Sequence, residues 1–182
     1  MTGQEAARYT RVAILLHWLI AALIVVNLLV GFFHEDFDKP VRGTLMAFHK
    51  STGITILALS LARLAWRLTH RPPAYDVSMR PWERVLARAT HILFYVLLIA
   101  MPLSGWLLSS TGTRPVGLWY GLFGIAKLPA AAETHDLWEE SHELLGYLML
   151  ALVVLHVAGA LKHHFEGHRH MIERMKLARR GG

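Results

Sequence analysis

The sequence predicts an all-α fold, a transmembrane four-helix bundle with up-down topology, and three observations lead to this prediction. Of the 182 residues, 54% are hydrophobic and only 18% are charged, whereas a typical soluble domain has about 25% charged residues. Four apolar stretches are each long enough to cross a hydrocarbon core about 30 Å thick. The basic residues are divided unevenly between the segments that flank these stretches, as membrane topology requires.

Each apolar stretch predicts one membrane-spanning helix, and together they form a single membrane domain over residues 1–182. We expect the helices at approximately 12–33, 45–68, 85–109 and 137–163. The first is interpreted as a retained helix, because it is too long for the core of a signal peptide. The third contains Pro102, where we expect a kink that a membrane helix tolerates. The loop from Ser110 to Asp136 is expected to lie across the outer mouth of the bundle.

The charge distribution predicts the orientation in the membrane. Of the 19 lysine and arginine residues, 14 flank the ends where the first helix begins and the fourth ends, and 5 flank the opposite ends. Both termini are therefore expected in the cytoplasm, with the chain as a multi-pass protein of the bacterial inner membrane. The 13 acidic residues divide 5 to 8, which leaves the inner side at +9 and the outer side at −3. Topology thus explains the basic balance, and we expect lipid contacts and no nucleic-acid partner.

Histidine is the unusual residue type, with 12 copies, and cysteine is missing from the sequence. The lack of cysteine excludes disulfides, thiol nucleophiles and covalent haem attachment. His142 and His156 are 14 residues apart on the fourth helix, which is a rise of about 21 Å and a rotation only 40° short of four turns. They share one face, one near each membrane surface. His17 offers a partner at the inner level and His49 at the outer level, so we expect two haem groups, each with two axial histidine ligands to its iron.

Small residues next to these histidines support the same assignment. A flat, wide haem requires a small side chain one helical turn from its ligand, and positions i and i+4 share a face. The residues four positions after the four ligands are Ala21, Gly53, Gly146 and Ala160. His91 has the inner depth, but Tyr95 follows it at this spacing. We therefore leave His91 out of the ligand set.

Other interpretations of the histidines were compared with this one. A single membrane histidine often hydrogen-bonds between helices, but four at paired depths with small neighbours favour haem. Zinc is disfavoured, because two separate pairs do not make a three- or four-ligand site. Histidines near the inner end of the fourth helix are expected to form a solvated interfacial cluster.

Several segments together resemble a known family. These are RYTRVAILLHWL, FHKSTG, MPLSGWLL, SHELLGY and HVAGALKHHF, which in this order span nearly the whole chain. The sequence resembles the prokaryotic cytochrome b561 family, which is similar to the cytochrome b subunits of nickel–iron hydrogenases and formate dehydrogenases. The resemblance implies two b-type haems, the outer one held by His49 and His142 and the inner one by His17 and His156. It also implies electron transfer with the quinone pool.

We therefore expect a membrane dihaem cytochrome b, an oxidoreductase that carries electrons between the periplasmic face and ubiquinone or another quinone. The resemblance implies that some members oxidise superoxide and others pass electrons from a soluble redox partner. An outer charge of −3 would repel superoxide, but Lys127 and Arg114 are candidates for an anion entry patch. Arg63, 14 residues after His49, is a candidate partner for an inner haem propionate. His163, two turns beyond His156, and His91 are candidate proton carriers for quinone.

Two other function classes remain open. The first is a membrane-anchor cytochrome b subunit that passes electrons for a partner dehydrogenase or hydrogenase. The second is a metal or proton transporter that uses the histidines without redox chemistry. A visible spectrum separates the second from the haem proteins.

Overall fold

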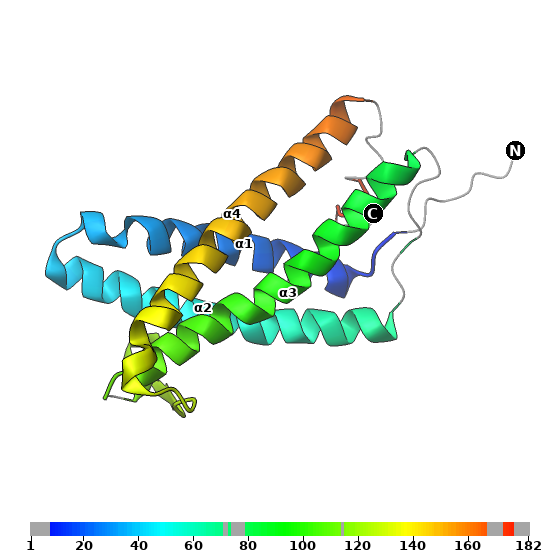
Figure 1. The fold of residues 1–182 in the computed structure, drawn as a ribbon. Coiled ribbons are helices and arrows are strands. Elements are labelled where there is room, and N and C mark those ends of the chain that lie inside the picture. The colour runs from blue at the N-terminus through cyan, green and yellow to red at the C-terminus, as the bar shows by residue number, and fades with distance from the viewer. Residues whose placement is uncertain (1–7, 71–72, 74–78, 114, 167–172, 177–182) are drawn as a thin grey trace, which may run out of the picture.

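The computed structural model describes residues 8–70, 73, 79–113, 115–166 and 173–176. It contains four long helices in the described residues, each long and apolar enough to cross a membrane. Their bounds are α1 Arg11–Phe33, α2 Lys39–Thr69, α3 Pro81–Thr111 and α4 His135–Phe165. The predicted all-α bundle is therefore confirmed. α1 begins and α4 ends at one end of the bundle, which we call the inner end, and the opposite end is the outer end (Figure 1).

Two helices begin earlier than hydropathy predicted, because polar capping segments extend them. α2 begins at Lys39, with Asp38 at the N-cap and Pro40 in the first turn, where a missing N–H costs nothing. α3 begins at Pro81, where the Glu83 carboxylate accepts a hydrogen bond from the Arg80 backbone N–H at 2.9 Å. These turns contain charged residues, so an apolar pattern alone does not mark them. Pro102 lies inside α3, which remains one continuous helix.

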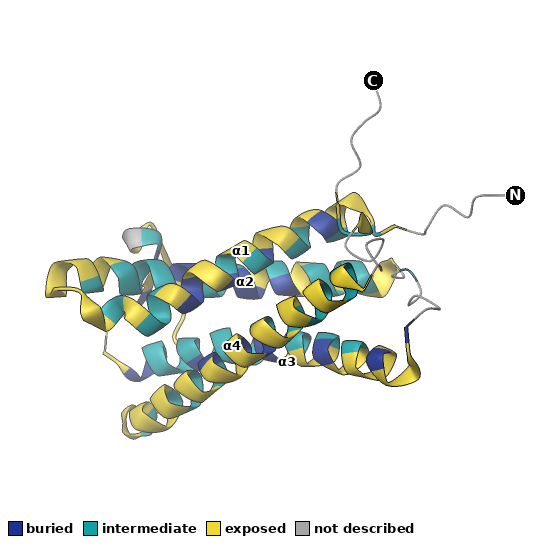
Figure 2. Ribbon diagram, turned by 90° about the horizontal axis from the view of Figure 1, so that it is seen from above, coloured by how far each residue is buried: buried dark blue, intermediate teal, exposed yellow. Residues whose placement is uncertain are grey.

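The helices pack in chain order, α1 on α2, α2 on α3 and α3 on α4. Figure 2 shows the buried residues on the sides of the helices that face one another, with exposed residues outside. A buried apolar layer lies at mid-height, formed by Ile20, Ile24, Leu28, Ile56, Leu97, Leu98, Met149 and Leu152. Large apolar side chains also face outward, as expected where lipid is the solvent.

The connection between α3 and α4 contains a short antiparallel hairpin, which hydropathy did not predict. Strand β1, Val116–Leu118, pairs with strand β2, Phe123–Ile125. Between them, Trp119 has a positive φ of 47°, which is uncommon for a residue with a side chain. The Trp119 backbone N–H donates to Ser51 Oγ on α2 at 2.7 Å. The hairpin is therefore fastened to α2 two residues from His49, at the outer end.

Candidate functional site

The outer histidine pair is His49 on α2 and His142 on α4. Their ring centres are 5.9 Å apart and the ring planes are nearly perpendicular, at 88°. His49 Nδ1–H donates to the Asn27 carbonyl at 3.1 Å, and His142 Nδ1–H donates to the Met101 carbonyl at 3.1 Å. A carbonyl oxygen only accepts, so each ring has its hydrogen on Nδ1 and a free lone pair on Nε2. That is the tautomer needed for binding a metal through Nε2.

Two glycines on neighbouring helices make room for the outer rings. A Cβ atom at Gly31 on α1 would lie 3.0 Å from His49 Cε1. A Cβ atom at Gly105 on α3 would lie 2.9 Å from His142 Cε1. Both distances are shorter than ordinary van der Waals contact, and each ring is held by its hydrogen bond. These positions therefore require glycine if the histidines keep their orientation.

The MPLSG segment of α3 surrounds the ring of His142. Besides the Met101 carbonyl, Ser104 Oγ lies 3.0 Å from His142 Nδ1 and accepts a hydrogen bond from it. The Ser104 hydroxyl in turn donates to the Met101 carbonyl at 2.7 Å. Gly105 supplies the space beside the ring. This segment thus provides two hydrogen-bond acceptors and free space for the ring of one histidine.

The outer pair lies in the wall of a cavity of about 430 Å³, a size typical of small-molecule and cofactor sites. The two glycines of the predicted i+4 pattern, Gly53 and Gly146, also line it. Asn27 is 7% exposed, and its side-chain Oδ1 has no hydrogen-bond partner among the described residues. A buried polar atom without a partner in a cavity wall indicates a bound group or water.

The inner histidines form a group of three rather than a pair. The ring centre of His156 on α4 lies 6.3 Å from that of His17 on α1 and 6.0 Å from that of His91 on α3. Within the described residues, the three rings accept and donate no hydrogen bond. They are enclosed by other rings instead: Trp18 lies 5.3 Å from His17 and Phe94 lies 5.3 Å from His156. Distance alone does not separate His17 from His91 as the partner of His156.

The separations of the rings suit a shared metal. Histidine nitrogens lie about 2.0–2.1 Å from bound metal ions such as zinc, and the ring centre is about 1 Å further, so two histidines on opposite sides of one ion have centres about 6 Å apart. The observed 5.9 Å and 6.3 Å match this value. The residues present therefore fit a haem iron with two axial histidines at each level.

Arg63 lies near the inner histidines, as its spacing predicted. Its guanidinium is close enough to His17, His91 and His156 for a charge interaction. It is also 6.0 Å from the ring centre of Tyr95. A cation at this position is available to an anionic group bound beside the inner histidines.

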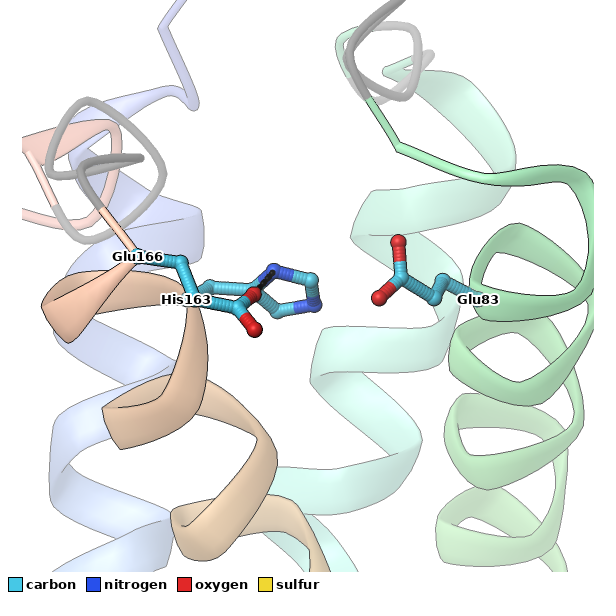
Figure 3. Close-up of side chains that lie close together, drawn as sticks. All are labelled: Glu83, His163 and Glu166. Atoms are coloured by element: carbon cyan, nitrogen blue, oxygen red, sulfur yellow. Dashed lines mark ion pairs between the residues drawn. The ribbon is translucent and has the colours of Figure 1, made fainter.

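A charged cluster ties α3 to α4 at the inner end, and it contains His163 (Figure 3). Lys162 Nζ donates to Glu83 Oε1 at 2.8 Å and to Glu166 Oε2 at 3.0 Å. His163 Nδ1 lies 4.0 Å from the same Glu166 oxygen. These three histidine and carboxylate side chains are close enough to hold a metal ion, but the Lys162 ammonium already pairs with both carboxylates. We interpret the cluster as a structural contact between the helices.

Lys127 and Arg114 were the candidates for an anion entry patch in the outer loop, and the structure describes only Lys127. Lys127 Nζ donates to the Gly112 carbonyl, just after the end of α3. Within the described residues, the lining of the outer cavity includes Lys50 and does not include Lys127. Arg114 lies outside the described residues.

Sequence reasoning missed Gly31, Gly105 and Ser104, although a signal for the two glycines was present. The interval of 14 residues that relates His142 to His156 also relates His17 to Gly31 and His91 to Gly105. Each helix therefore carries one residue of the site at each level on one face. For Ser104 and the backbone carbonyls, no sequence signal was available, because their role depends on contacts between helices.

Comparison with known proteins agrees with this geometry. The family described as prokaryotic cytochrome b561 matches residues 8–177. The chain belongs to the prokaryotic cytochrome b561 family. Its relatives include Cytochrome b561 homolog 2 of Escherichia coli, 30% identical over 92% of this chain and 90% of that protein. The Probable superoxide oxidase CybB of Yersinia pestis is 27% identical over 96% of this chain and 98% of that protein.

A third relative covers only part of the chain. Cytochrome b562 of Cereibacter sphaeroides is 29% identical over 54% of this chain and 66% of that protein. As a cytochrome b561 family member with four candidate spans, the protein is a multi-pass cytochrome b of the bacterial inner membrane that contacts the lipid bilayer and binds haem b. The five segments that suggested the family all lie within the matched residues.

Proposed function

We propose that this cytochrome b561 holds two haem b groups and transfers electrons between the outer face of the membrane and a quinone near the inner end. One haem lies between His49 and His142, and the other between His17 and His156. Bound there, each haem supplies a one-electron redox centre. The chain supplies the axial nitrogens, the buried surroundings and the hydrogen bonds that orient the ligands. This proposal includes cytoplasmic termini and a single membrane domain.

One observation carries the proposal: two histidine pairs with metal-like separation lie at two depths of one bundle. Because His142 and His156 lie on the same helix, the levels differ by about 21 Å along it. The buried apolar layer that includes Met149 and Leu152 lies between them. Two redox centres stacked in this way connect the two sides of the membrane, whereas a transporter would need a polar path through that layer.

Superoxide is one candidate electron donor at the outer face, in line with the name of the Yersinia relative. Each superoxide anion would give up one electron and leave as dioxygen. Two such electrons and two protons taken from the inner side convert one quinone to its quinol. The local charge opposes this donor, since the outer cavity is lined by Glu35, Glu139 and Glu143 against Lys50.

A soluble redox partner, or a larger dehydrogenase for which the chain serves as membrane anchor, is the second candidate. The same three carboxylates favour it, because they attract a protein with a basic contact surface. Rising ionic strength should then slow electron transfer from a cationic donor and speed transfer from superoxide. The direction in which salt changes the electron-transfer rate therefore distinguishes a cationic redox partner from superoxide.

At the inner end, quinone reduction needs a group that delivers protons. His91 lies beside His156, and His163 lies in the charged cluster between α3 and α4. Both are candidates for this role. His164→Ala is a suitable control, because His164 neighbours His163 but points elsewhere around the helix.

The function is tested by stopped-flow spectroscopy of the purified haem protein in lipid discs. Superoxide or a soluble donor should reduce the haem, and added ubiquinone should reoxidise it. The quinone step should slow in His91→Ala or His163→Ala and not in His164→Ala. Haem that no quinone reoxidises would contradict the proposed acceptor. If all three variants show normal spectra and normal quinone kinetics, the quinone site should be sought at the outer end.

A further inference from the structure

A groove of about 420 Å³ lies between α2 and α3, and neither histidine pair accounts for it. Its wall includes Leu64 and Arg67 from α2 and Arg88, Ile92, Val96 and Ile99 from α3. Of the inner histidines, only His91 reaches this wall within the described residues, so the groove is separate from the space between His17 and His156. It opens on the side of the bundle that faces lipid.

The groove is charged at one end and apolar along its length. Arg88, Ile92, Val96 and Ile99 follow one another on a single face of α3, from the inner end toward the middle of the bundle. The eleven steps from Arg88 to Ile99 along α3 rise about 16 Å. This is close to the thickness of one leaflet of a hydrocarbon core about 30 Å across. The groove therefore has the length and polarity of a lipid acyl chain below a headgroup.

Among the described residues, the cationic end has no anionic partner. Arg67 lies 5.6 Å from the ring centre of Tyr95, which holds the guanidinium on the groove side of α2. In the described part of the chain, no carboxylate forms an ion pair with Arg67 or Arg88. Cations at membrane depth are costly unless an anion or water pairs with them. An anion from outside the described residues would compensate this positive charge.

We propose that the groove binds an anionic phospholipid of the inner leaflet. Its phosphate lies between Arg67 and Arg88, and one acyl chain lies along Ile92, Val96 and Ile99. Basic residues at the cytoplasmic ends of membrane helices attract anionic headgroups. Guanidinium groups also match phosphate oxygens with paired hydrogen bonds. The proposal does not depend on which donor or quinone the cytochrome uses.

Native mass spectrometry of the haem-loaded protein tests this, after equilibration with phosphatidylglycerol and phosphatidylcholine. The wild type should retain one phosphatidylglycerol in preference to phosphatidylcholine by about tenfold to thirtyfold, from two arginines near the headgroup. The double variant Arg67→Gln, Arg88→Gln should lose the preference. Arg11→Gln removes one positive charge from the inner end of α1, outside the groove, and should keep the preference. The visible spectrum verifies that each variant is folded.

A second variant tests the apolar part without changing charge. Val96→Phe fills the groove at mid-length and should weaken retention of phosphatidylglycerol while Arg67 and Arg88 remain. Equal retention of the two lipids by the wild type would overturn the proposal, as would a preference that survives in the double variant. Displacement of the lipid by a short-chain ubiquinone at equal concentration would also overturn it, since the groove would then belong to the quinone.

Discussion

The two histidine levels position their rings by different physical means. At the outer level, hydrogen bonds from Nδ1 of His49 and His142 to backbone carbonyls fix both tautomer and orientation. At the inner level, aromatic contacts surround His17 and His156, and a third histidine, His91, lies equally close. The outer site is thus specified by polar contacts with neighbouring helices, and the inner site by packing.

This difference shows which substitutions each level should tolerate. At the outer level, a histidine ring fixed by a hydrogen bond cannot move aside. Substitutions of the residues that accept its hydrogen bond or leave space beside it should therefore affect haem binding, as substitutions of the histidines do. At the inner level, the rings have more rotational freedom, and a nearby charge has more effect than a hydrogen bond.

The largest effect is expected from the ligands themselves. His49→Ala or His142→Ala should remove the outer haem, and His156→Ala the inner one, so haem content should fall from two per chain to one. The loss follows because a haem iron with one axial histidine is held much less firmly. The pyridine haemochrome assay with protein quantification measures it. One haem per chain in the wild type would contradict the dihaem arrangement.

His17 and His91 provide the next test, at the inner level. His17→Ala should remove the inner haem and His91→Ala should leave both, because Ala21 clears space beside His17 whereas Tyr95 fills the equivalent position beside His91. The same haem assay decides between them. If His91→Ala loses a haem and His17→Ala keeps both, His91 is the ligand and the small-residue argument is wrong.

The next largest effect is expected from Gly31 and Gly105, which leave space for the outer histidine rings. Gly31→Ala or Gly105→Ala places a Cβ atom 3.0 Å or 2.9 Å from a histidine carbon. Overpacking of this kind costs about 1–3 kcal/mol, so outer haem should be lost at lower temperature. Thermal loss of the Soret band measures the effect.

Two other glycines are matched controls for this substitution. A Cβ atom at Gly43 on α2 or Gly159 on α4 would meet no atom within 4 Å. Gly43→Ala and Gly159→Ala should leave the haem unchanged and stabilise their helices slightly. Equal behaviour of all four variants would mean that the histidine rings are not confined at the outer level.

Arg63→Gln should act on the inner haem alone. Its positive charge favours the reduced form of a nearby haem, since reduction adds a negative charge. Removing it should lower the inner midpoint potential by several tens of millivolts and leave the outer potential unchanged. A spectroelectrochemical titration resolves the two. If only the outer midpoint potential shifted, the prediction that Arg63 acts on the inner haem would be wrong.

The smallest effect is expected from Ser104→Ala, at the outer level. His142 would lose one of two hydrogen-bond acceptors at Nδ1, and a typical hydrogen bond contributes about 1 kcal/mol. The imidazole becomes a slightly weaker electron donor, so the outer potential should rise modestly. The titration used for Arg63 measures it. An unchanged outer potential would show that the Met101 carbonyl alone fixes the ring.

Much of the fold and the depths of the histidines could be predicted from local patterns. Hydropathy located the four helices, and helical geometry placed His142 and His156 on one face. The early start of α2 at Lys39 was missed, because its first turns are polar. The hairpin β1–β2 was missed as well, since its three-residue strands are too short to show a period.

The membrane-spanning helices, the orientation expected from charge and the two depths of the histidines follow from the sequence, because hydropathy, flanking charge and spacing along a helix are all local properties. The tertiary structure decided which side chains meet across helices. It placed Gly31 against His49 and Gly105 against His142, brought His91 beside His156, and set Lys127 on the Gly112 carbonyl. The physical reason is that helix neighbours and the rotation of each helix about its axis follow from packing of the whole bundle, which no local pattern contains.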